Sequence, residues 1–285
     1  MARPLSKKAL LLLVYMTSLL YSFSYALPLY VNSSLLTDTI STEKAVGLVY
    51  AIGAICLILA TLALPHILKR FGNYRTTRVI VLLEIIALIM LGTLTNPIYV
   101  VLAFICHQVL ATTVYLNLSA FLEAFSDDTS TGGIRGMFLT VVNSAYVIAP
   151  FLAGMMLTNG GFDKIYIASA AFMLAVYILI STNFKDYKDP IYTTPALIDT
   201  FNHVWENHNL HAIIFLQFLL NFFYAWMVIY TPIYLHDHLG IPMNQILGII
   251  IPVALMPFVI FQVYLGKIAD AKFGEKEILI LGLII

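Results

Sequence analysis

The chain has 285 residues, of which 61% are hydrophobic and only 11% are charged, and its mean hydropathy is +0.91. Soluble domains are about half apolar and about a quarter charged, so this composition excludes an ordinary water-soluble fold and predicts a protein solvated largely by lipid. The 15 Lys and Arg residues balance 15 Asp and Glu residues, so no charge excess indicates a nucleic-acid partner. Cys56 and Cys106 fall inside apolar runs, which favours buried structural thiols over a disulfide or a metal site.

Long apolar runs dominate the sequence. A helix needs about 20 apolar residues to cross a bilayer core about 30 Å thick. Eight runs meet that length, and a ninth begins at about residue 277. The eight cover 9–31, 45–67, 78–95, 98–122, 136–158, 163–183, 211–235 and 244–265. They are continuously apolar rather than alternating, so we expect membrane-spanning helices and not the strands of a barrel.

The first run also has features of a secretory signal peptide. It follows the basic residues Arg3, Lys7 and Lys8, and Ser24-Tyr25-Ala26 resembles a small-residue cleavage site. The run stays apolar beyond that point, which favours a membrane span.

Basic residues predict the orientation. With the N-terminus in the cytoplasm, all but two of the 15 Lys and Arg residues fall on cytoplasmic segments, and the exceptions are Lys44 and Lys164. Cytoplasmic loops of membrane proteins carry an excess of Lys and Arg. We therefore expect a multi-pass protein of the cell membrane with a cytoplasmic N-terminus.

The longest connection, 184–210, divides the chain into three parts. Thr194-Pro195 reads as a helix start, with proline at the first helical position. Apolar residues then recur at helical spacing, at Leu197, Phe201, Val204 and Trp205. We expect an amphipathic helix on the cytoplasmic face, which links a six-helix bundle (1–183) to an incomplete second bundle (211–285) with helices seven, eight and the start of nine.

Two features recur in the two parts. Pro28-Leu-Tyr30 ends the first run and Pro232-Ile-Tyr234 ends the seventh. Each is followed, at nearly the same distance, by a basic loop that contains Phe-Gly, at 64–75 and at 266–276. This agreement predicts parallel repeats of six helices, as found in one large class of transporters.

The second of these loops, Gly266-Lys-Ile-Ala-Asp270-Ala-Lys272-Phe-Gly274-Glu-Lys276, resembles the signature loop of the major facilitator superfamily. In that family the loop joins helices two and three of a half and takes part in the inward–outward switch. The resemblance implies an all-α integral membrane protein with a major-facilitator-like bundle: a six-helix N-terminal half plus an incomplete second half. It also assigns the switch role to Gly266, Asp270, Lys272 and Gly274.

The first loop matches the same pattern only in part. Lys69, Arg70 and Gly72 are kept, while Leu64 and Leu68 stand where the family has glycine and aspartate. The resemblance extends the switch role to the three matching residues. Further along, Glu123 and Arg135 border the acidic 126–133 loop, and we expect them to form a cytoplasmic charge pair that helps gating.

Polar side chains recur at spacings of three and four within several apolar runs, as expected of helices that line a cavity. In the family that the chain resembles, the first and fourth helices of each half line the cavity. The predicted cavity residues are Tyr21, Ser22, Tyr25, His107, Gln108, Thr112, Tyr115, Asn143, Gln217, Asn221 and Tyr224. The alternative is that the hydroxyls bond to backbone carbonyls and the tyrosines pack between helices.

Two ionisable residues lie inside the predicted spans. His107 is near the middle of the fourth run, where it could bind a solute, carry a proton or stay neutral between helices. Glu84 lies in the third run, where it could join His107 in proton coupling, pair with Arg78 or reach toward the membrane surface.

These observations predict a secondary transporter, without a cofactor, that moves a small solute by alternating access and could be driven by protons. They argue against an enzyme: the histidines at 203–211 and those at 236–238 fall on opposite faces of the predicted membrane and lack a zinc-protease spacing. The alternative is a truncated, non-transporting membrane scaffold. We expect the repeat to need further helices, from a longer gene product or from a partner that supplies them.

Overall fold

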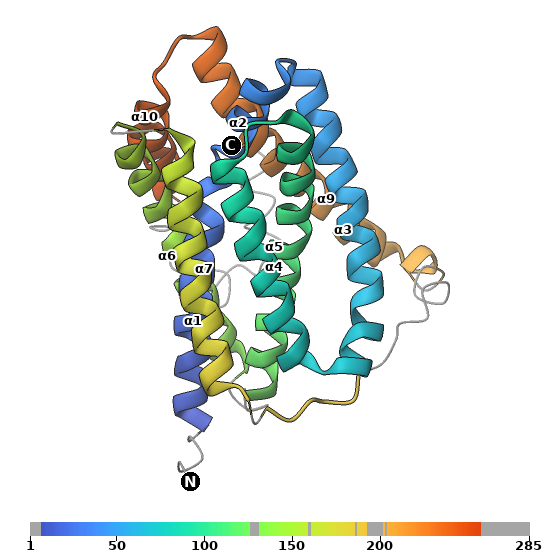
Figure 1. Cartoon of the computed structure of the whole chain (residues 1–285). Coiled ribbons are helices and arrows are strands. Elements are labelled where there is room, and N and C mark those ends of the chain that lie inside the picture. The colour runs from blue at the N-terminus through green and yellow to red at the C-terminus, as the bar shows by residue number, and fades with distance from the viewer. Residues whose placement is uncertain are drawn as a thin grey trace.

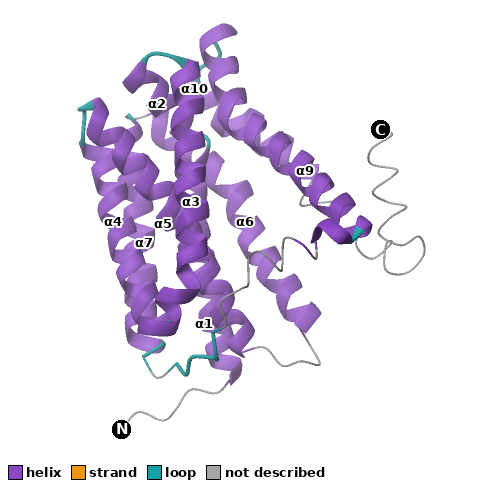
Figure 2. Ribbon diagram, turned by 90° about the vertical axis from the view of Figure 1, so that its right-hand side faces the viewer, coloured by secondary structure: helices purple, strands orange, loops and turns teal. Residues whose placement is uncertain are grey.

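A computed structural model of the chain describes residues 7–125, 131–158, 161–185, 187–192, 202 and 204–257. Across those ranges the regular structure is helical (Figures 1 and 2). Seven helices there are long and apolar enough to cross a membrane, and a shorter apolar helix covers Met243–Pro257. The all-α class expected from the apolar runs is confirmed.

The helices of the N-terminal part follow the predicted runs closely. They are α1 (Lys7–Leu29), α2 (Asn32–Ile40), α3 (Glu43–Phe71), α4 (Asn73–Thr93), α5 (Pro97–Phe125), α6 (Thr131–Thr158) and α7 (Phe162–Asn183). Each of the first six runs has its own long helix, because a backbone inside lipid must bond to itself.

The short helix α2 is the one element here that the sequence does not predict. It carries buried polar residues, Asn32, Ser33 and Ser34, so it has no apolar run to reveal it. Asn32 accepts a 2.7 Å hydrogen bond from the hydroxyl of Tyr166 in α7. Ser41, at the C-terminal cap of α2, has a positive φ of 58°, so the helix ends there and α3 begins two residues later.

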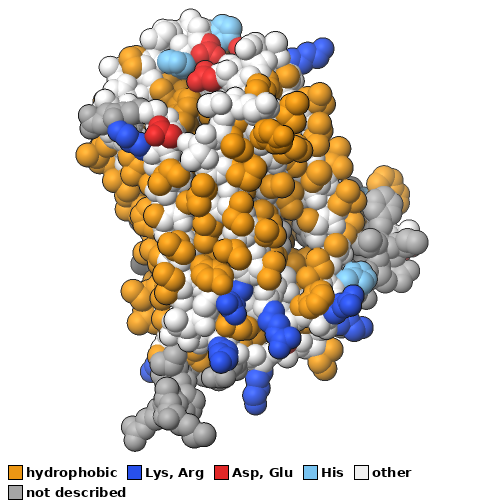
Figure 3. Space-filling view, viewed as in Figure 1, with side chains coloured by type: hydrophobic (Ala, Val, Ile, Leu, Met, Phe, Trp, Pro, Cys, Tyr) orange, Lys and Arg blue, Asp and Glu red, His pale blue; other side chains and the backbone are white. Residues whose placement is uncertain are grey.

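A shared core joins these helices. α4 packs against α5 and α7, and α1 packs against α6 and α7. Side chains such as Leu88, Phe104, Leu118 and Met173 are fully buried. Large apolar side chains on the outward faces stay exposed, and in Figure 3 they cover the middle of the molecule. This is the surface pattern of a helical bundle in lipid.

The C-terminal part adds α9 (His208–Ile233), η1 (Tyr234–His238), α10 (Met243–Gln245) and η2 (Ile246–Ile250). α9 contacts α2, while α10 and η2 contact α6. From its contact with α2, α9 runs obliquely away from α3 (Figure 2). The widened π-helical turn η2 comes just before Pro252, which lacks the N–H that a regular helix would need there.

Charges separate along the bundle. Figure 3 shows Lys and Arg gathered at its lower end, where Figure 1 places the start of α1 and the α3–α4 turn. Acidic side chains and some of the histidines lie at the upper end, where a few Lys and Arg side chains are also visible, and another histidine lies among the basic residues lower down. Three predicted features lie wholly or largely outside the described residues: the amphipathic linker helix, the start of the ninth run and the second signature loop.

Candidate functional site

A large cavity lies between the two parts of the chain. It has a volume of about 1080 Å³ and is bounded by α1, α5, α6, α9 and the helix that ends at Pro257. Seven of the predicted cavity residues line it: Tyr21, Tyr25, Thr112, Tyr115, Asn143, Asn221 and Tyr224.

Other lining residues carried little or no signal in the sequence. Leu139, Val142 and Met227 are apolar members of the wall, and an apolar residue in a membrane helix looks the same whether it faces lipid or a cavity. Tyr30 and Tyr146 also line the cavity. Tyr146 shares a helix face with Asn143, three residues earlier, and that spacing predicts a place in the cavity wall. Tyr30 belongs to the repeated Pro-x-Tyr sequence, which was the available clue to its position.

Four predicted cavity residues are not among those that line it. Ser22 is buried and donates to the carbonyl of Ser18 at 2.7 Å. Gln108 lies against Gly53 of α3, so close that a Cβ on that glycine would overlap its amide. Gln217 is exposed on α9. The fourth, His107, is buried beside α4.

Tyrosines form a connected aromatic wall. The rings of Tyr21 and Tyr25 stack with centroids 6.2 Å apart, and Tyr25 meets Tyr146 edge-on at 6.1 Å. The Tyr21 hydroxyl donates to the carbonyl of Ala111 at 2.8 Å, which holds that ring in place. Together with the amides of Asn143 and Asn221, this wall offers aromatic surface and neutral hydrogen-bonding groups.

Glu84 and His107 meet behind the wall. Oε1 of Glu84 lies 2.6 Å from Nδ1 of His107, and the two side chains are 0% and 2% exposed. Oε2 of Glu84 is buried without a hydrogen-bond partner among the described residues. Glu84 therefore pairs with His107 rather than with Arg78, which donates to the Tyr177 hydroxyl at 3.1 Å. The ring of His107 lies 6.4 Å from that of Tyr25, a lining residue of the cavity.

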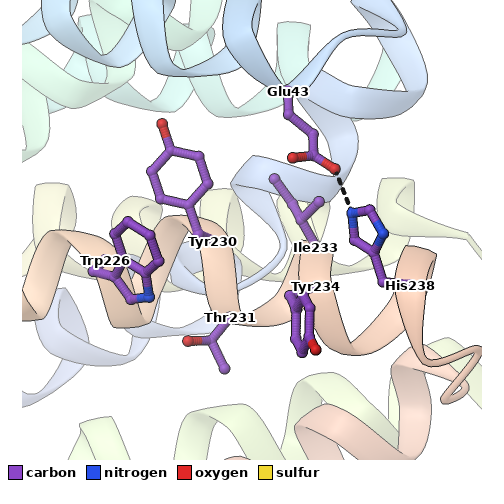
Figure 4. A pocket seen from close by; sticks show the side chains of 7 residues that line it. All are labelled: Glu43, Trp226, Tyr230, Thr231, Ile233, Tyr234 and His238. Atoms are coloured by element: carbon purple, nitrogen blue, oxygen red, sulfur yellow. Dashed lines mark hydrogen bonds and ion pairs between the residues drawn. The ribbon is translucent and has the colours of Figure 1, made fainter.

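The two parts of the chain contact each other at the acidic end of the bundle. Nε2 of His238 lies 2.9 Å from Oε1 of Glu43 (Figure 4). Figure 4 also shows Tyr230 on the same side of α9 as Glu43, and its hydroxyl comes so close to Gly47 that a Cβ there would lie 2.6 Å from it. These residues belong to elements that start or end at the acidic end of the bundle.

A second contact at this end is between backbones. A Cβ on Gly154 of α6 would lie 2.6 Å from the nitrogen of Gly248 and 3.0 Å from the carbonyl oxygen of Asn244. Glycine at this position therefore lets α6 and η2 approach more closely than any other residue would allow.

The predicted switch residues gather at the basic end as far as they are described. Lys69 and Arg70 are exposed in the last turn of α3, where positive charge complements the helix dipole. Gly72 links α3 to α4 with φ 78° and ψ 158°. Glu123 is exposed near the end of α5.

The remaining switch residues are not placed. Arg135 lies in α6, but its side chain is not described, so the expected pair with Glu123 stays a prediction. Gly266, Asp270, Lys272 and Gly274 lie outside the described residues.

Metal chemistry finds no support in the described part of the chain, where no three His, Cys, Asp or Glu side chains come together. Cys56 and Cys106 are free thiols. The expectation that both are buried is wrong, because Cys56 of α3 is only partly buried and Cys106 is exposed on α5.

Comparisons with known proteins place this architecture. Residues 9–285 match the model of the Major Facilitator Superfamily. The fold is similar to a crystal structure of the nucleoside transporter NupG, with a TM-score of 0.72, 16% identity, and coverage of 96% of this chain and 71% of that one. A D323A mutant of NupG matches with a TM-score of 0.71 and 15% identity, over 93% of this chain and 69% of that one. No curated protein matches the sequence.

Proposed function

Because this chain belongs to the major facilitator superfamily, we propose that it carries a small neutral solute across the cell membrane by alternating access, driven by protons. The observation that carries the proposal is the cavity between its two parts, closed at one end. A transporter of this kind exposes one central site to each side in turn, as its two bundles rock against each other. The moving bodies would be 1–183 and 211–285, joined by the 184–210 linker.

The arrangement of charge supports an inward-facing state. The contacts at Glu43–His238 and Gly154–Gly248 close the acidic end, while Lys and Arg gather at the other end (Figure 3). Since cytoplasmic loops are rich in Lys and Arg, the basic end and the N-terminus would face the cytoplasm. The cavity would then open toward the cytoplasm and be closed from outside.

The wall of the cavity supports a neutral solute with a ring. The described lining contains no Lys, Arg, Asp or Glu, so nothing there would neutralise a charged solute taken out of water. Tyrosine rings favour flat faces, and their hydroxyls, together with Asn143 and Asn221, suit hydroxyl and amide groups. A nucleoside has both features, so uridine is the first probe to use.

Counterflow of labelled uridine into proteoliposomes that contain the purified chain tests the proposal. Counterflow needs alternating access but no ion gradient. A panel of nucleosides, hexoses and amino acids extends the test to other neutral and zwitterionic solutes.

A matched pair of variants in α9 shows whether the cavity is the solute site. Asn221 lines the cavity, whereas Gln217, one turn away, does not. Loss of a hydrogen bond worth roughly 0.5–1.5 kcal/mol should slow counterflow by about 2- to 13-fold in Asn221→Ala, while Gln217→Ala should behave as wild type. An absence of counterflow across the whole panel would instead favour the non-transporting scaffold.

A further inference from the structure

The Glu84–His107 pair is the one contact between ionisable side chains that the described part of the chain buries at the middle of the bundle. Glu84 comes from α4 and His107 from α5, and the two side chains are almost fully enclosed. Neither lines the cavity. Ionisable groups inside a membrane protein are expensive to place there and are a functional hypothesis by default.

No other charged side chain of the described ranges faces this pair. From α1 the groups that face it are the hydroxyls of Tyr21 and Tyr25, which interact electrostatically with Glu84. α3 presents Tyr50, whose ring packs on Phe104 beside His107, and Cys56, which interacts with Cys106 of α5. The remaining neighbouring elements carry their ionisable groups elsewhere.

α7 contributes Tyr166, which donates to Asn32, and Tyr177, which accepts from Arg78. α2 contributes Asp38, which interacts with Asp237 and His236. Among the described residues, His107 is therefore the only cationic partner within reach of Glu84. The net charge of the pair is set by its own protons.

Because the pair is isolated from other charges, its net charge depends on how many protons it holds. With one proton, the pair is neutral, either as carboxylate and imidazolium or as carboxylic acid and imidazole. With no proton it carries a net negative charge, and with two a net positive charge, and both are costly away from water. Oε2 of Glu84 has no donor among the described residues, so this oxygen is where a further proton or a water molecule would be held.

We propose that Glu84 and His107 form the proton-binding site of this transporter and hold one exchangeable proton behind the solute cavity. This inference rests on the proposed function. When a proton binds, H⁺ adds to the carboxylate–imidazole pair and gives the neutral one-proton pair. When it is released, the proton passes to water in the cavity. Tyr25 lies between the pair and the cavity, because its ring contacts that of His107 and also lines the cavity.

The net charge of the deprotonated pair couples proton binding to the change of access. When the proton leaves, the pair keeps a net negative charge between α4 and α5, which must be stabilised by water from the open cavity. Closing the cavity around a deprotonated pair would remove that water. The bundles therefore change access only when the pair carries its proton, and a proton gradient drives the solute.

Two neutral variants test the site without changing its shape much, Glu84→Gln and His107→Gln. Wild type should accumulate uridine in proteoliposomes when an inward proton gradient is imposed. In either variant, gradient-driven accumulation should fall at least about tenfold. Counterflow should be kept, because it needs no net proton movement. Asp163→Asn, which removes an exposed carboxylate from the first turn of α7, should keep both gradient-driven accumulation and counterflow.

Infrared difference spectra of the purified protein in lipid nanodiscs test proton binding without any solute. Between about pH 5 and 9, the range in which buried carboxyls have been found to titrate, wild type should show a change in carboxyl absorption that is absent in Glu84→Gln and altered in His107→Gln. Asp163→Asn should keep the change.

The outcomes separate the two proposals. Counterflow in wild type together with normal gradient-driven accumulation in Glu84→Gln would overturn the proton site and leave the transport function standing. Absence of counterflow in wild type across the whole panel of solutes would overturn the transport function, and the infrared difference would then decide the proton site alone. Identical spectra for wild type and Glu84→Gln would overturn it.

Discussion

The carboxylate of Asp189 accepts a 2.7 Å hydrogen bond from the backbone N–H of Asn73, the first residue of α4. The first N–H groups of a helix have no partner within it, and Gly72, which precedes α4, has no side chain to cap it. Asp189, in the segment after α7, supplies the cap across the fold. The Tyr192 hydroxyl donates to the same carboxylate at 2.7 Å. Burial raises the pKa of Tyr192, and the bond to Asp189 adds to this, so the hydroxyl stays a donor at neutral pH.

Replacing Asp189 by Ala should loosen the start of α4. Loss of a capping carboxylate costs about 1 kcal/mol, and the released N–H groups should exchange with solvent faster. Hydrogen–deuterium exchange of the peptide that contains Asn73 measures this. Lys188→Ala, at the neighbouring exposed residue, is the control, and equal exchange in both variants would contradict the capping role.

Gly72→Ala should destabilise the protein for two separable reasons. At φ 78° and ψ 158° the backbone lies in a region used almost only by glycine, with a cost of about 1–3 kcal/mol for other residues. A Cβ would also overlap the Asp189 carboxylate. The thermal midpoint should fall, and in an Asp189→Ala background it should fall by less, because only the backbone cost remains. Additive effects of the two changes would rule out the contact.

Gly154→Ala should push α6 and η2 apart at the closed end of the cavity, since its Cβ would meet the backbone of Gly248 at 2.6 Å. We expect greater access from the acidic side, measured as the rate at which a water-soluble maleimide labels a cysteine placed at Asn143, which lines the cavity. Gly248→Ala is a matched control, because a Cβ there has nothing within 4 Å. Equal labelling in the two variants would show that this contact does not close the cavity.

Tyr166→Phe should weaken the attachment of α2. Removing the hydroxyl leaves the buried oxygen of Asn32 without its donor, at a cost of about 1–3 kcal/mol. The thermal midpoint of the purified protein should fall. Tyr99→Phe, at an exposed tyrosine near the start of α5, should leave it unchanged, and a similar midpoint for both variants would contradict the role of this bond.

The sequence by itself determined the class of the protein and most of its helices. Apolar runs long enough to span lipid have few alternatives, because a backbone in lipid must satisfy its own hydrogen bonds. The runs at 98–122 and 163–183 accordingly became α5 and α7 with ends shifted by a few residues. α2 escaped notice because its buried face is polar, and hydropathy does not distinguish such a segment from a loop.

Only the tertiary structure decided which polar side chains meet. Asn221 and Gln217 lie four residues apart on the same face of α9, yet the first lines the cavity and the second does not, because α9 runs obliquely away from the bundle toward its start (Figure 2). Glu84 and His107 are separated in the sequence by the latter part of α4, a loop and the first part of α5, so no spacing rule joins them. Their contact at 2.6 Å depends on the vertical register between α4 and α5, and it turned two isolated ionisable residues into one site.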